Sequence, residues 1–360
     1  MRIFWRYGGD ERHPAEQLAR AVDHLGYDGY LLAIGAGGQD QWVTAAALAH
    51  YTERAKFLIA VYPGIVSPLM LASQTATLDK ITKGRIALNV INGEARSSAA
   101  HGIFLDHDER YEMADEYWTA WRQLMTGERV SFAGRHIRFE GAQLHVQGVQ
   151  SPHPELFFGG SSPAGLAMAA KQVQTYLTWG EPPAQAAEKI GAVRVLASAR
   201  GRTLNYGIRL HLIVRDTKEE AWAAVQRIYD RFDQEQIQLA LKVRATSDSV
   251  GVQRMTALVN GKITKNARDL EISPDLWAGY TLTGKGPGTA LVGDPETVAE
   301  RLLEYYHAGF DTFILSGQPQ LEEAYRVAEK IFPLLPFNVE NSRRRNESLR
   351  TLRNLAAVVS

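Results

Sequence analysis

Short runs of β-branched and aromatic residues alternate with longer amphipathic runs along most of this 360-residue chain. This alternation limits the possible folds strongly, because strands that alternate with helices form a parallel sheet with helical crossovers. The last unit shows it most clearly: Asp294-Pro295 starts a helix, Gly309 ends it, and residues 310–315 form a strand. We count eight strand candidates, over residues 3–7, 29–34, 55–62, 85–91, 155–158, 175–178, 206–214 and 310–315.

Eight strands favour a closed barrel over an open doubly wound sheet. No G-x-G-x-x-G sequence follows an early strand, which weakens the Rossmann alternative. We therefore predict an α/β fold, a (β/α)8 TIM barrel with insertions, as one domain over residues 1–336. Residues 337–360 form a basic C-terminal tail. We interpret the tail as a solvated helix or as an arm that contacts another subunit of a homodimer or homotetramer.

Two regions interrupt the alternation. A hairpin-like excursion is expected over residues 130–146. About 60 residues then separate Phe232 from the helix at Asp294, which is too many for a plain connection. This length predicts an insertion over about 233–290 that is partly helical, with a glycine-rich end that acts as a mobile lid over the barrel mouth. An insertion without a function is the alternative.

Composition excludes several classes of function. Lys plus Arg and Asp plus Glu both number 40, so we expect neither nucleic acid nor a membrane as a partner. The absence of cysteine excludes disulfides, thiolate nucleophiles and cysteine-bound zinc. No histidine pair has metal-ligand spacing on a recognisable helix, so no metal is expected. No signal peptide is recognised, and no stretch approaches the ~20 apolar residues of a membrane span, so we expect a soluble, cytoplasmic protein.

The strand over residues 206–214 carries the most distinctive polar pair. Arg209 and His211 share one of its faces, because side chains alternate along a strand, and the apolar residues between them occupy the opposite face. The apolar face must pack under the helices, so the polar pair points into the barrel. An unpaired buried guanidinium is costly, so we expect Arg209 to meet an anion. An internal salt bridge beside a core histidine is the alternative.

Other strand ends carry candidate ligand-binding residues, because sites in a barrel form where strands end and loops follow. The turn Gly159-Gly160-Ser161-Ser162 precedes a helix that starts at Pro163, which is suited to bind a phosphate. Asn89 lies near a strand end, where its amide is suited to the edge of a heterocycle. Trp179 and Trp5 are aromatic residues that would stack on a ligand. Ordinary turn and core roles remain the alternatives for all of them.

Several long segments carry a resemblance that covers about residues 4–336. They include Gly102-Ile-Phe-Leu-Asp-His-Asp-Glu-Arg-Tyr-Glu112, Phe158-Gly-Gly-Ser-Ser162, Tyr176-Leu-Thr-Trp-Gly-Glu-Pro-Pro183, Gly207-Ile-Arg-Leu-His211 and Leu270-Glu-Ile-Ser-Pro-Asp-Leu-Trp-Ala-Gly279. Together they resemble the alkanesulfonate monooxygenases, which belong to the bacterial-luciferase-like flavin monooxygenases.

The resemblance implies a (β/α)8 barrel that receives FMN in its reduced form, FMNH2, from a separate flavin reductase. Reduced flavin activates O2, and the enzyme oxygenates the carbon that bears the sulfonate of a small organosulfonate. The products are an aldehyde and sulfite. The flavin supplies the redox chemistry, while the protein binds, orients and excludes water.

The resemblance also implies roles for single residues. Arg209 and His211 match the catalytic pair beside the flavin and the sulfonate, and Trp179 matches an active-site tryptophan that contacts the substrate. The positions expected to bind FMN comprise a segment around the phosphate and two positions near the flavin ring. They are Tyr111, Gly160, Ser161 and Ser162 for the phosphate, and Ala60 and Asn89 for the ring.

Three positions depart from the family's pattern. Gly38 replaces a cysteine, Gly284 replaces a lid arginine next to Lys285, and Gln318 replaces an active-site tyrosine. We expect Lys285, Gln318 and Gln39 to contact the substrate together with Trp5. Amides in place of a phenol would suit a hydroxylated sulfonate such as sulfoquinovose as well as a simple alkanesulfonate. A monooxygenase of a non-sulfonate such as a sulfone, and a flavin-binding barrel without catalysis, are the alternatives.

Overall fold

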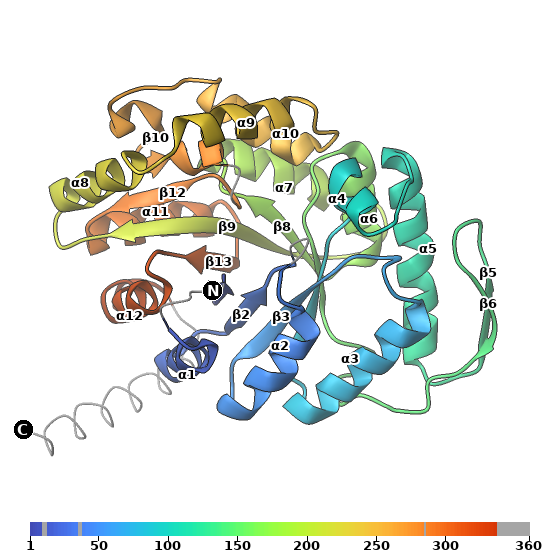
Figure 1. Ribbon diagram of the computed structural model, residues 1–360. Helices are drawn as coiled ribbons and strands as arrows, with labels where there is room; N and C mark the ends of the chain where they lie inside the picture. The colour runs from blue at the N-terminus through green and yellow to red at the C-terminus, as the bar shows by residue number, and fades with distance from the viewer. Residues whose placement is uncertain (9–12, 35–37, 284–285, 337–360) are drawn as a thin grey trace, which may run out of the picture.

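The computed structural model describes residues 1–8, 13–34, 38–283 and 286–336. Eight parallel strands form a closed barrel with helices around it (Figure 1). In barrel order they are β1 (Arg2–Tyr7), β2 (Gly29–Leu32), β3 (Lys56–Val61), β4 (Ile86–Val90), β7 (Leu156–Phe158), β8 (Thr175–Trp179), β9 (Asn205–Val214) and β13 (Thr312–Ser316). The β8–β9 and β13–β1 pairs close the barrel. These are the eight strands expected from the sequence, so the predicted (β/α)8 fold is confirmed.

The helices that cover the barrel begin at residues that the sequence marks well. Ser67 caps α3, and Asp294 caps α11 by accepting from Thr297 N, each with proline in the first helical position. Asp106 and Glu109 form a capping box at the start of α5. The covering helices are α1 (Ala15–Leu25), α2 (Gln41–Leu48), α3 (Pro68–Thr82), α5 (His107–Met125), α6 (Pro163–Gln172), α7 (Pro183–Ser198), α8 (Lys218–Tyr229), α11 (Pro295–His307) and α12 (Gln320–Lys330), with the 3-10 turns η1 (Ala49–Tyr51) and η4 (Phe332–Leu334).

The strands separate two apolar layers. Between the strands and the helices lies the main core, and Trp5 belongs to it. Inside the barrel lies a smaller cluster that comprises Phe4, Leu31, Leu58, Ala87, Phe157, Leu177 and Ile314. The prediction that Trp5 binds substrate is wrong, because its fully buried side chain points outward and packs edge-on against Tyr27 with ring centroids 5.5 Å apart. Phe4, one residue earlier, faces the barrel interior instead.

The N-terminal end of the barrel is held together by Arg2. Its guanidinium donates to Thr312 Oγ1 at 2.9 Å, to Glu155 Oε2 at 2.9 Å and to Thr175 Oγ1 at 3.0 Å. These partners precede or begin three different strands, β13, β7 and β8. Active sites of such barrels form at the opposite end, so this network contributes to stability.

Two excursions leave the barrel. The expected hairpin is present as β5 (Val130–Ala133) and β6 (Arg138–Ala142), an antiparallel pair that stands apart from the helices (Figure 1). The short helix α4 (Ala95–Ala100) follows β4. Between α8 and α11 the chain is partly helical, as expected, and forms several short elements. They are α9 (Gln234–Ala245), α10 (Val250–Val259), η2 (Ala267–Leu270), β10 (Glu271–Ser273), β11 (Leu276–Trp277), η3 (Gly279–Thr283) and β12 (Ala290–Gly293).

The elements between α8 and α11 attach to the barrel through β9. This strand is long enough to pair with β8 along residues 205–209 and with β12 along residues 211–214. A second apolar cluster, which includes Trp277 and Val292, packs these elements against α8. Among the described residues, no helix is both long and apolar enough to cross a membrane.

Candidate active site

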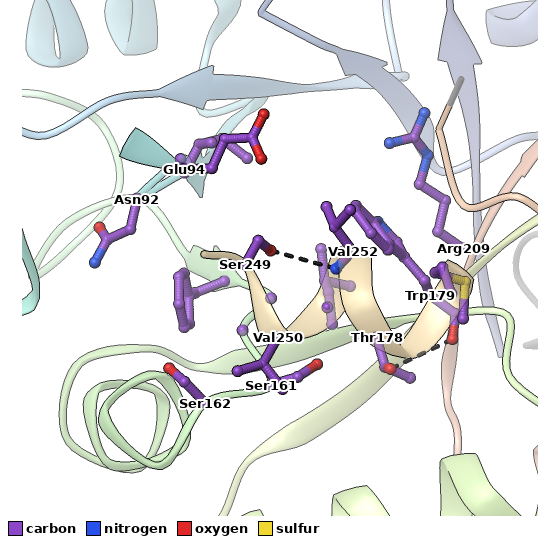
Figure 2. A pocket seen from close by; sticks show the side chains of 18 of the residues that line it. Asn92, Glu94, Ser161, Ser162, Thr178, Trp179, Arg209, Ser249, Val250 and Val252 are labelled. Carbon is purple, nitrogen blue, oxygen red and sulfur yellow. Dashed lines mark hydrogen bonds between the residues drawn. The ribbon is translucent and has the colours of Figure 1, made fainter. Parts of the chain in front are cut away.

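A cavity of about 310 Å³ lies at the carboxyl ends of β4, β7, β8 and β9. Its volume is in the range of small-molecule sites, and its position is that of the active site in barrels of this type. It brings together seven residues that the sequence predicted for the site: Asn89, Tyr111, Gly160, Ser161, Ser162, Trp179 and Arg209. Figure 2 shows Ser161 and Ser162 at one end of the cavity and Trp179 and Arg209 at the other.

The end of the cavity at Ser161 and Ser162 is built from two helix N-termini. Ser162 caps α6, because its Oγ accepts a hydrogen bond from the backbone N–H of Gly165 at 3.1 Å. Ser249 caps α10 in the same way, by accepting from Val252 N at 3.3 Å, and lies close to Ser161 and Ser162 (Figure 2). Helix N-termini carry partial positive charge and free N–H groups, so two of them facing one space favour an anion.

Glycine at position 160 keeps this end open. A Cβ there would lie 2.6 Å from the ring of Phe158 and 3.2 Å from the hydroxyl of Tyr111. Burial raises the pKa of Tyr111, while a hydrogen bond with Ser162 and the charge of Arg110 act in the opposite direction. Tyr111 therefore remains a neutral phenol at neutral pH, which can donate a hydrogen bond to an anion at the start of α6.

Ion pairs hold α10 over the cavity. Arg254 of α10 contacts Glu181 with Nε–Oε1 2.5 Å, and Lys189 of α7 contacts the same carboxylate at 2.8 Å. Glu181 is 1% exposed and lines the cavity, so its charge is balanced by both cations. Asp248, just before α10, pairs with the buried Arg110 at 2.6 Å. Nothing in the sequence alone singled out these five ion-pairing residues.

Arg209 forms the opposite end of the cavity, and His211, two residues further along the same face of β9, does not line it. Arg209 lines the cavity beside Trp179 (Figure 2). His211 Nδ1 lies 2.8 Å from Ser316 Oγ, and its ring packs against Tyr280 with centroids 4.7 Å apart. A Cβ on Gly286 would lie 3.3 Å from a terminal nitrogen of Arg209 and 3.4 Å from His211 Nε2, so the backbone of Gly286 covers both groups.

Each of the two groups has one buried nitrogen that no described residue satisfies. Within the described part of the chain, Arg209 Nε and His211 Nε2 are buried and make no hydrogen bond. Burial lowers the pKa of His211 to about 3, and the charges of Arg209 and Arg6 add to this effect. Burial and the charge of Arg6 lower the pKa of Arg209 to about 9. At neutral pH the pair is therefore one guanidinium cation beside one neutral imidazole.

The remaining predicted residues lie elsewhere. Ala60 is paired in register with Asn89 across β3 and β4 but does not line the cavity; its carbonyl accepts from Gln41 at 3.0 Å. Gln39 and Gln318 are exposed, in the loops after β2 and β13, and do not line the cavity either. Lys285 and Gly284 lie outside the described residues. Contact of these residues with a ligand stays a prediction.

Residues 5–312 match the luciferase-like monooxygenase family. The chain belongs to this family. The match begins within β1, spans β2 to β9, ends at Thr312, the first residue of β13, and includes all the cavity residues named above.

Solved structures with the same fold differ in what they bind. A riboflavin lyase with modified FMN and riboflavin is 23% identical, with a TM-score of 0.75, covering 92% of this chain and 90% of that one. An EDTA monooxygenase from Chelativorans sp. BNC1 is 16% identical, with a TM-score of 0.72 and coverage of 93% of both chains. A coenzyme F420-dependent tetrahydromethanopterin reductase from Methanopyrus kandleri is 16% identical, with a TM-score of 0.68, covering 93% of this chain and 99% of that one.

At this level of identity the similarity establishes a shared fold and not a shared ligand. The chemistry of this luciferase-like monooxygenase must therefore be argued from its own cavity. Among the described residues, no group of three or more His, Cys, Asp or Glu side chains is placed to hold a metal ion.

Proposed function

We propose that the protein is an FMNH2-dependent monooxygenase that cleaves the C–S bond of an organosulfonate and releases sulfite and an aldehyde. One observation carries the proposal: the same cavity has two helix N-termini, suited to an anion, at one end, and at the other the guanidinium of Arg209, which has no acidic partner among the described residues. A flavin mononucleotide and an anionic substrate need these two sites in one space.

The residues at the start of α6 fit the phosphate of FMN. Gly160 lets a ligand approach the backbone closely, and Ser161, Ser162 and Tyr111 offer hydroxyl groups. Asn89 lines the space between this end and Arg209, where the flavin ring would lie. Bound reduced flavin supplies two electrons and activates O2.

The proposed reaction balances with O2 and FMNH2 as co-substrates. One oxygen atom is added to the carbon that bears the sulfonate, and the other leaves as water after FMNH2 has supplied two electrons. The C–S bond then breaks, the electron pair leaves with sulfur as sulfite, the carbon becomes a carbonyl, and one proton is released. A separate flavin reductase that regenerates FMNH2 is part of the proposal.

The chain's own residues bind and orient the substrate in this scheme. Arg209 holds the sulfonate through charge-assisted hydrogen bonds. His211 is neutral and is oriented by Ser316 and Tyr280, so its buried Nε2 would offer a hydrogen bond next to Arg209 without taking up a proton. Trp179 forms an apolar wall, and α10 above the cavity excludes water.

Sulfite release tests the proposal. With FMN, O2 and a flavin reductase, we expect sulfite from at least one member of a panel of alkanesulfonates and sulfoquinovose, and none from dimethyl sulfone. Arg209→Met should lower kcat/KM by about ten- to a hundredfold, since a charge-assisted hydrogen bond is worth about 1.5–3 kcal/mol.

Other outcomes separate the alternatives. If no sulfonate yields sulfite, C–S cleavage is wrong. Oxidation of dimethyl sulfone instead, with Arg209→Met tolerated, would identify an enzyme for uncharged substrates. FMN binding without consumption of any substrate would identify a flavin-binding barrel without catalysis.

A further inference from the structure

A second arginine reaches the same part of the barrel from another strand. Arg6 lies on β1, two residues after Phe4, whose side chain is inside the barrel. Arg6 therefore shares the inward face of β1 at its carboxyl end. A Cβ on Gly8, at the barrel mouth, would lie 2.7 Å from a terminal nitrogen of Arg6.

The strand register places Arg6 next to the Arg209–His211 pair. In the barrel, β13 separates β1 from β9. Trp5 of β1 pairs in register with Leu315 of β13, so the next residues, Arg6 and Ser316, also lie side by side. Ser316 in turn pairs in register with His211 of β9 and forms a hydrogen bond with its Nδ1. Adjacent strands lie about 4.8 Å apart, so two long arginine side chains reach the same point above β13.

Neither arginine has a negative partner in the described part of the chain. The Nε atoms of Arg6 and Arg209 are both buried without a hydrogen bond, and neither side chain forms an ion pair there. The positive charge of Arg6 is one cause of the lowered pKa of both Arg209 and His211, which shows how closely it approaches them. The buried Arg110, by contrast, is paired with Asp248.

Among the described residues, these two guanidinium groups have no acidic partner, and they repel each other beside a neutral imidazole. An anion between them would offset this repulsion and satisfy their free N–H groups. We propose that Arg6 is a second substrate-binding residue, and that the head group of the substrate bridges Arg6 and Arg209. This rests on the proposed function, which it extends from one contact to two.

The proposal predicts the class of head group. One guanidinium engages two oxygens of an oxyanion side by side. A sulfonate has a third oxygen left for Arg6, whereas a carboxylate has none. The site should therefore prefer sulfonates to carboxylates of the same carbon skeleton, and Arg6 should be the origin of that preference.

Anion binding by the flavin-free full-length protein tests this without turnover. We expect methanesulfonate to raise the Tm of the wild type more than acetate does. Arg6→Met should lose most of the methanesulfonate shift and respond equally to both anions, and Arg6→Lys should keep part of it. Arg20→Met, which removes an exposed arginine stacked on Tyr51 on the outside of the barrel, is the matched control for loss of one charge.

Kinetics supply the second measurement. With the sulfonate that the enzyme turns over, Arg6→Met should raise KM about tenfold or more while kcat changes less, because Arg6 binds the head group and does not act on the reacting carbon. A wild-type KM and a wild-type methanesulfonate shift in Arg6→Met would overturn the proposal. If Arg6→Met does not fold, Arg6→Lys is the test. A KM and a methanesulfonate-induced Tm shift equal to those of the wild type in Arg6→Lys would contradict a direct contact between the Arg6 guanidinium and the head group.

The two proposals fail in different ways. Methanesulfonate binding that depends on Arg6, without sulfite from any sulfonate, would leave the anion site standing and remove C–S cleavage. Sulfite production that is unaffected in Arg6→Met would support C–S cleavage and show that Arg6 does not bind the substrate.

Discussion

His211 occupies a position where a proton is costly. Its imidazole is buried, contacts Ser316 and Tyr280, and faces the charges of Arg209 and Arg6. The folded-state pKa of about 3 lies below the ordinary histidine value of 6.5, so between these values the unfolded chain binds a proton that the folded protein does not. The folded state must therefore lose stability as the pH falls through this window.

His211→Asn should remove this part of the pH dependence. From pH 6.5 down toward pH 3, the free energy of unfolding of the wild type should fall by about 1.4 kcal/mol per pH unit more than that of the variant. Urea unfolding of both proteins at several pH values measures the difference, in which the titration of carboxylates common to both cancels. Near pH 8 the free energies of unfolding of the two proteins should change in parallel with pH. If they stay parallel down to pH 4, the lowered pKa of His211 is wrong.

At the scale of elements, two helices from distant parts of the chain define the phosphate end of the cavity. Residues 159–162 lead directly into α6, and residues 247–249 lead into α10. The N-terminal end of α10 is held there by Asp248 with Arg110 and by Arg254 with Glu181. An anion between the two helices therefore interacts with both the barrel and the segment above it.

Gly160→Ala should weaken FMN binding. The added methyl group would lie 2.6 Å from the ring of Phe158 and 3.2 Å from the hydroxyl of Tyr111, so Tyr111 or the turn must shift. Such overpacking costs about 1–3 kcal/mol, and the Kd for FMN should rise about tenfold or more. Fluorescence quenching of FMN measures the change.

Gly191→Ala is the control for this substitution. Gly191 lies within α7, and a Cβ there meets nothing within 4 Å. The FMN affinity should be unchanged, and the free energy of unfolding should rise by about 0.5–1 kcal/mol, because alanine favours a helix. Equal FMN affinity in both variants would show that the turn at Gly160 does not bind the flavin.

At the scale of the whole molecule, the barrel divides into a stabilising end and a functional end. The N-terminal end contains Arg2 with its hydrogen bonds to Glu155, Thr175 and Thr312, which join three strands. The carboxyl end contains the cavity and the unpaired groups. Arg2 is paired with Glu155 at the N-terminal end, whereas Arg6 and Arg209 have no acidic partner among the described residues at the carboxyl end.

Arg2→Met should therefore destabilise the protein without changing its site. Loss of four partly buried hydrogen bonds, two of them to the Glu155 carboxylate, should lower the free energy of unfolding by about 1–3 kcal/mol. Chemical unfolding measures this, and the Kd for FMN serves as the second measurement, with no change expected. A changed FMN affinity would mean that the two ends of the barrel are coupled.

Local patterns in the sequence predicted much of this arrangement. Eight strands were placed from residue type and spacing, and the inward position of Arg209 followed from the alternation of side chains along one strand. The turn at Gly160 was assigned as an anion site because it joins a strand to a helix. Each of these inferences needs only residues that are close in the sequence.

Contacts between segments that are distant in the sequence could not be predicted from these local patterns. Trp5 and Arg6 are neighbours on one strand, yet Trp5 packs in the outer core and Arg6 shares the inward face with Phe4, and only the barrel's closure decides which face is inside. Glu181 and Arg254 are 73 residues apart, so nothing local pairs them. The sequence by itself determined the barrel strands and the polar face of β9, because strand and helix periods are local. Only the tertiary structure decided which charges remain unpaired, because pairing depends on what the closed barrel brings together.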